Sequence, residues 1–64
     1  MKNNFIEVTN EDGKLLINLL NVVKVTPNGD GTLFVFNFSK KDVVYVAIAK
    51  EPYQTIKKMI DAQQ

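Results

Sequence analysis

The fold is decided by residues 28–49, which read NGDGTLFVFNFSKKDVVYVAIA. The segment opens on Asn-Gly-Asp-Gly, whose members accept the positive φ angles that tight hairpin turns require. Two runs rich in β-branched and aromatic residues follow, over 32–38 and 43–49, with the polar turn Ser-Lys-Lys-Asp between them. This stretch therefore predicts an antiparallel hairpin.

Both faces of the predicted hairpin are apolar. Because side chains alternate along a strand, three phenylalanines share one face of the first strand and two aliphatic residues share the other. The first face carries Phe34, Phe36 and Phe38, and the second carries Leu33 and Val35. The second strand is apolar at every position from 43 to 49. A sheet with one solvated face would alternate apolar with polar residues, so both faces of this hairpin need to be covered.

Three shorter strands precede the hairpin. Alternating apolar and polar residues, bounded by Asn, Asp, Gly and Pro, predict strands over 5–9, 14–18 and 22–26. Residues 19–21, Leu-Leu-Asn, interrupt the alternation and indicate a bend or one helical turn. Loops of about three to five residues join consecutive strands, whereas a parallel connection needs about a dozen or more. We therefore expect the strands to form a five-stranded antiparallel meander.

The period of the sequence changes near its C-terminal end. Apolar residues recur there at helical spacing, with polar residues between them. Pro52 suits the first turn of a helix, because the N–H that it lacks would be unpaired there. These features predict a helix over about 52–62, and its apolar residues are Tyr53, Ile56, Met59 and Ile60. The complete fold expected for residues 1–64 is a single β-rich α+β domain, a meander with one C-terminal α-helix.

One helix of this length covers part of one sheet face. The remaining apolar surface is covered either by curling of the sheet into a small barrel or by a second subunit, and we expect a homodimer or higher homo-oligomer. Spacing does not tell which face the helix takes. Two groups are therefore candidates for the contact between subunits, Phe34, Phe36 and Phe38 on one face or Leu33, Val35 and Tyr45 on the other.

Composition narrows the range of functions. The chain has no Cys and no His, which removes thiolate ligands, the commonest metal ligand and the usual general base near neutral pH. Its hydroxyl groups therefore have no imidazole to activate them, and we expect neither an enzyme nor a bound cofactor. The longest apolar run, 43–49, is far shorter than the ~20 residues of a membrane-spanning helix. No segment resembles a signal peptide, so the expected location is the cytoplasm, without membrane attachment.

Lysines are the candidate residues for nucleic-acid contact. The candidates are two pairs of neighbouring lysines, Lys40 with Lys41 and Lys57 with Lys58. The formal net charge is only +1, which gives little long-range attraction to phosphates. All the basic residues are Lys, whereas bidentate recognition of phosphate or guanine favours Arg. Nucleic-acid binding is therefore the less favoured alternative.

Short motifs follow one another in a recognisable order from Phe5 to Ile60. They comprise an opening strand, an Asp-Gly turn, an Ile-Asn pair, an aliphatic strand, a Pro turn, a further strand and an acidic residue before the helix. In this sequence they are 5–9, 12–14, 17–18, 22–25, Pro27, 44–46 and Glu51. In this order they resemble the FlbD-like family of small flagellar and swarming-motility proteins. That family has no assigned enzymatic residues, so the resemblance implies a non-catalytic role.

A second resemblance covers only the later part of the chain. The segment Asn-Val-Val-Lys-Val at 21–25, the hairpin after it and the amphipathic helix over 53–60 are similar to the C-terminal half of LytTR-type DNA-binding domains. This resemblance implies a nucleic-acid-binding accessory or regulatory protein. The function that we expect from the residues is a small, self-associating interaction or assembly module, and the sequence does not identify its protein partner.

Overall fold

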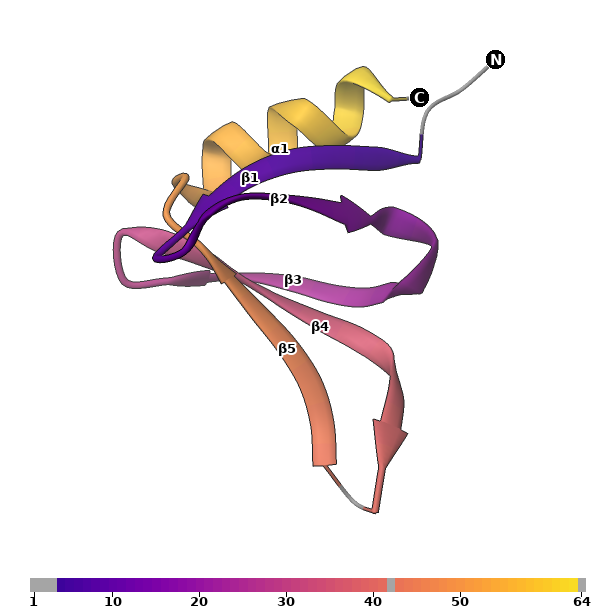
Figure 1. The fold of residues 1–64 in the computed structure, drawn as a ribbon. Helices are drawn as coiled ribbons and strands as arrows, with labels where there is room; N and C mark the ends of the chain where they lie inside the picture. Colours follow the sequence, from indigo (N-terminus) through magenta and orange to yellow (C-terminus); the bar gives the residue numbers. More distant parts are fainter. Residues whose placement is uncertain (1–3, 42, 64) are drawn as a thin grey trace.

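The computed structural model describes residues 4–41 and 43–63. Its strands are β1 (Phe5–Asn10), β2 (Gly13–Asn18), β3 (Val22–Asn28), β4 (Gly31–Lys40) and β5 (Val43–Ala49). A 3-10 helix, η1 (Leu19–Asn21), lies between β2 and β3, and the α-helix α1 (Tyr53–Ala62) follows β5 (Figure 1). The predicted fold is confirmed: five antiparallel strands and one C-terminal helix form a β-rich α+β domain. The strands are divided between two sheets, β1-β2 and β3-β4-β5.

The β1–β2 hairpin presents one apolar face to the core. Its turn lies between Asn10 and Gly13, which are paired in the register. Gly13 adopts a φ of +121°, a conformation that L side chains rarely adopt. The alternation that predicted these strands places Ile6 and Val8 of β1 and Ile17 of β2 on the buried side.

η1 is the point at which the chain leaves one sheet and enters the other. The side chain of Asn18 accepts a hydrogen bond from the Leu20 N–H at 3.0 Å, which caps the turn. The Leu19 N–H donates to the carbonyl of Asn4 at 2.8 Å and ties the turn back to the start of β1. Of the bend and the helical turn expected at the break in alternation, the structure has the helical turn.

β4 is the bent strand of the larger sheet. Val35 pairs with Val46, but the next pair along β4 is Ser39 with Val44. Two more residues of β4 than of β5 thus lie between these pairs, and such bulges bend the strand that carries them. The end of the β4–β5 hairpin accordingly curves away from the rest of the molecule (Figure 1). We call the described residues at this end of the hairpin, 36–41 and 43–46, the arm.

α1 covers the phenylalanine face of the larger sheet. The spacing of residues in the sequence did not tell which face the helix would cover. Phe34 and Ile56 are both fully buried in the same core cluster. In Figure 1, α1 lies behind the β1–β2 hairpin, on the same side of the larger sheet. The apolar core of the described residues therefore lies where the hairpin, the sheet and the helix meet, and it consists of Ile6, Val8, Ile17, Phe34, Ala49 and Ile56.

The strands do not close into a barrel in the part of the chain that the structure describes. The two sheets meet where the Lys50 N–H donates to the carbonyl of Thr9 at 2.7 Å. From that point β1 and β5 diverge (Figure 1). The barrel alternative therefore does not provide the missing cover for the larger sheet.

Ile56 tests the packing of α1 against the sheet. Replacement of Ile56 by Ala removes a fully buried side chain from the core, and it should lower the free energy of unfolding by about 2–4 kcal/mol. Urea denaturation followed by circular dichroism measures this loss. Gln54→Ala, on the exposed side of α1, is the matched control and should change stability by less than about 0.5 kcal/mol. Equal stabilities for the two variants would contradict the packing described.

Candidate interaction surface

The larger sheet leaves one apolar face uncovered. Leu33 pairs with Ile48 and Val35 with Val46, and directly opposite residues of neighbouring strands share a face. All four point away from the Phe34 side that α1 covers. Val46 is 51% exposed and Ile48 is 54% exposed, whereas Leu33 and Val35 are half-buried. We call these four residues the outer face.

A second apolar group occupies the other side of the arm. The rings of Phe36 and Phe38 stack with centroids 5.6 Å apart and an interplanar angle of 19°. The ring of Tyr45 lies 5.1 Å from that of Phe38 and is tilted by 47°. Phe38 and Tyr45 are exposed, whereas Phe36 is half-buried at the margin of the core. Stacked and tilted aromatic pairs of this kind are favourable, and here they remain open to solvent.

Two features of the candidate contact residues are corrected by the structure. The expectation that Tyr45 shares a face with Leu33 and Val35 is wrong, because its ring packs on Phe38 on the opposite side of the hairpin. Phe34 belongs to the phenylalanine face but is fully buried, so it cannot contact another molecule in this fold. The other candidates are surface or half-buried residues.

A groove runs along the edge of β5 that faces away from β4. It encloses about 580 Å³ and lies between β5 and the turn of the β1–β2 hairpin. Its apolar part is formed by Leu15, Val46, Ala47 and Ile48, and charged residues of the turn lie at one end. In the described residues, β5 is the last strand of its sheet. Sequence reasoning missed this groove, because no local pattern shows that β1 and β5 diverge.

Glu51 fixes the geometry of this region. One carboxylate oxygen accepts a hydrogen bond from the Thr9 N–H at 2.8 Å, and the other accepts from the Thr9 hydroxyl at 2.9 Å. The backbone carbonyl of Glu51 accepts from the hydroxyl of Thr32 at 2.8 Å. Thr32 is fully buried, so this bond satisfies a polar group that has no access to water. Glu51 thus joins β1, β4 and the start of α1.

These contacts also determine the ionisation of Glu51. Burial opposes the charged form, but hydrogen bonds from the backbone N–H groups of Thr9 and Glu51 and from the Thr9 hydroxyl favour it, as does the charge of Lys14. The favourable contributions prevail, and the pKa of Glu51 lies below its ordinary value of 4.5. The carboxylate is therefore charged at neutral pH, when it binds Thr9.

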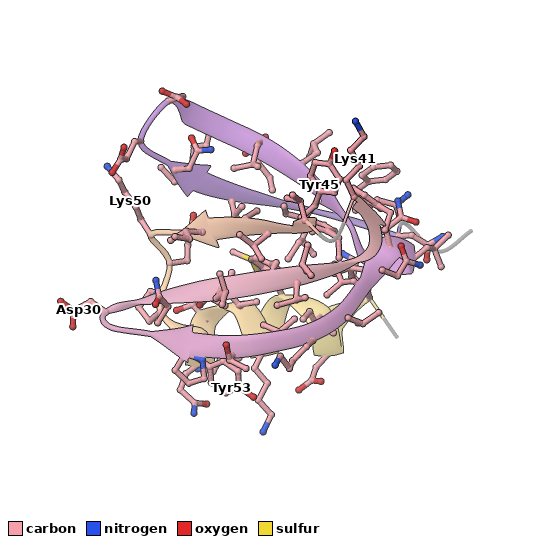
Figure 2. All side chains as sticks on the ribbon, turned by 90° about the horizontal axis from the view of Figure 1, so that it is seen from below. Asp30, Lys41, Tyr45, Lys50 and Tyr53 are labelled. Carbon is pink, nitrogen blue, oxygen red and sulfur yellow. The ribbon has the colours of Figure 1, made fainter. Side chains whose placement is uncertain are left out.

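The lysines proposed for nucleic-acid contact do not gather in one place. Lys41 lies at the end of the arm, whereas Lys57 and Lys58 are exposed on α1 at the other end of the molecule (Figure 1). Figure 2 places Lys41 and Lys50 at opposite sides of the structure as well. The side chain of Lys40 lies outside the described part of the chain. The described lysines therefore form no single basic surface.

Comparison with protein-family models, curated proteins and solved structures finds no match for this chain. Within the described residues, no group of three or more acidic side chains is arranged to hold a metal ion. No helix in that part of the chain has the length and apolar character needed to cross a membrane.

Removing the charge of Glu51 tests the contact by which this residue joins β1, β4 and the start of α1. Glu51→Gln should lower the free energy of unfolding at pH 7 by about 1–2 kcal/mol, because the bonds from Thr9 then no longer end on a charged oxygen. The pKa of Glu51 is depressed in the folded state. The stabilising effect of its charge is therefore complete above pH 4.5, and it is lost as the pH falls through the lower pKa of the folded state. The difference between the variant and the wild type should therefore shrink below pH 4.5, as measured by urea denaturation.

A matched control is Glu11→Gln, on the exposed β1–β2 turn. It should leave stability close to that of the wild type at pH 7. A difference between Glu51→Gln and the wild type that stayed constant down to pH 2 would contradict the charge-dependent role of Glu51.

Gly31 tests how closely the start of β4 approaches the end of β5. A Cβ atom at this position would collide with the backbone carbonyl oxygen of Ala49. Gly31→Ala should therefore lower the free energy of unfolding by about 1–3 kcal/mol. Gly29→Asn is the control, because Gly29 has a φ of +58° and open space around it, and Asn tolerates that conformation. Thermal denaturation of both variants should show the larger loss for Gly31→Ala.

Proposed function

We propose that this chain is a non-catalytic assembly module that forms a homodimer through β5 and the arm. One observation carries the proposal. Of the large apolar side chains that are exposed in the described residues, half belong to β5, namely Val43, Val44, Tyr45, Val46 and Ile48. Exposed apolar surface concentrated on one strand is typical of protein interfaces, since leaving it in water forgoes ~25 cal/mol for each Å² that could be buried.

The size of the surface supports the same proposal. The accessible surface of the chain is 4775 Å², whereas a compact monomer of 7.2 kDa is expected to expose roughly 4,100 Å². The surplus of roughly 650 Å² is what an open fold exposes when its sheets are incompletely covered. A net charge of +1 gives little repulsion between copies. A symmetric dimer is the simplest assembly that covers this surface, because one self-complementary patch forms the contact on both subunits.

The proposal places the protein in the cytoplasm. It agrees with the resemblance to the FlbD-like family, which implies a role without catalysis. It identifies the chain itself as the first partner, and any further protein would bind the assembled dimer.

Molecular mass in solution tests the proposal. Sedimentation equilibrium at micromolar concentration should give twice the 7.2 kDa of the chain. Val46→Lys should shift the protein toward the monomer with an unchanged circular dichroism spectrum, because it would bring two like charges together where the copies meet. A wild-type protein that stayed monomeric at every concentration would overturn the proposal.

Leu16→Lys provides the matched control. Leu16 is 63% exposed and lies on β2, opposite Glu7 of β1 and away from the arm. Leu16→Lys therefore removes at least as much exposed apolar surface as Val46→Lys, from a different part of the molecule, and it should leave the dimer intact.

A further inference from the structure

β5 has an edge that lacks the usual protections against pairing. Natural sheets guard exposed edges with charged residues, Pro or bulges. The opposite edge of the same sheet, β3, has all three, since it carries Lys24, Pro27 and a bulge between Val22 and Lys24. The sequence of β5, VVYVAIA, contains no charge and no Pro. An edge of this kind offers unpaired backbone N–H and C=O groups to another strand.

We propose that two copies of the chain pair through this edge, with β5 antiparallel to β5 of the second copy. This inference rests on the proposed dimer and specifies how it forms. The two three-stranded sheets would become one continuous sheet of six strands about a two-fold axis. β1 limits the edge that is available, because the Lys50 N–H already binds Thr9. The residues free to pair are therefore 43–48.

The side chains of β5 favour one register. A two-fold axis at Val46 places Val46 opposite its own copy and Val44 opposite Ile48, so that aliphatic side chains meet on the outer face. On the other side of the sheet the same register places Tyr45 opposite Ala47. A large side chain then lies over a small one, and Tyr45 enters the groove that Ala47 and Leu15 line. An axis at Tyr45 would instead set two tyrosines against each other.

This arrangement gives both exposed apolar groups new contacts. The outer faces of the two copies join across the axis into one surface. The exposed ring of Tyr45 gains cover in the second copy's groove, while it keeps its contact with Phe38. A dimer formed by stacking two outer faces would bury Val46 and Ile48 but would leave Tyr45 and the edge of β5 in water.

Single cysteines test the register, because the chain has no Cys of its own. Directly opposite residues of antiparallel strands have Cα atoms about 4.5–5.5 Å apart, which suits a disulfide. Val46→Cys should therefore form a disulfide with its own copy in most of the protein under mild oxidation. Val44→Cys and Ile48→Cys should each cross-link poorly alone and well when mixed. Val23→Cys, at a more exposed position on β3, should not cross-link.

The outcomes separate this inference from the proposed function. A wild-type dimer in which neither Val46→Cys nor the mixture cross-links would overturn edge pairing and leave the dimer standing. A wild-type monomer would overturn both. Hydrogen exchange gives a second measurement that needs no substitution: outward-facing amides of 43–48 should exchange at least tenfold more slowly in the dimer than at concentrations where the protein dissociates. Unchanged exchange would contradict the pairing.

Discussion

The contact between Glu51 and Thr9 is the constraint on which the arrangement of the two sheets depends. The Glu51 carboxylate holds β1, and its backbone carbonyl accepts from the buried hydroxyl of Thr32 on β4. One residue therefore fixes the beginning of α1 against both sheets. Because β1 is held at this end, while β5 runs away from it (Figure 1), the same contact that organises the core leaves the other end of β5 without a neighbour on one side.

Local sequence patterns predicted the elements well, because each pattern reports a property of a single segment. Alternation gave five strands, the change of period near Pro52 gave the helix, and the break at 19–21 gave the turn that became η1. The division into two sheets could not be predicted in this way. It depends on where the chain turns after Asn18 and on the long-range bonds of Glu51, and neither leaves a periodic signal in the sequence.

The candidate site was predicted only in part, and the reason is the register between β4 and β5. Alternation assigns faces within one strand, but it does not tell which face of the next strand lies beside them. Phe34 pairs with Ala47, so the alternation along β5 puts Tyr45 on the phenylalanine side, where its ring packs on Phe38. The burial of Phe34 follows from the position of α1, which the amphipathic pattern of the helix could not specify.

The exposed arm and the small core have a common physical origin. A chain of 64 residues buries only ~60% of the surface that its unfolded form exposes, and such a domain is marginally stable by itself. Adding cover to β5 within the same chain would require more residues, whereas a second copy supplies the cover without lengthening the chain. In the proposed dimer, association would stabilise the folded state by mass action. Folding and assembly would then be coupled, and stability would be a property of the pair of chains rather than of one.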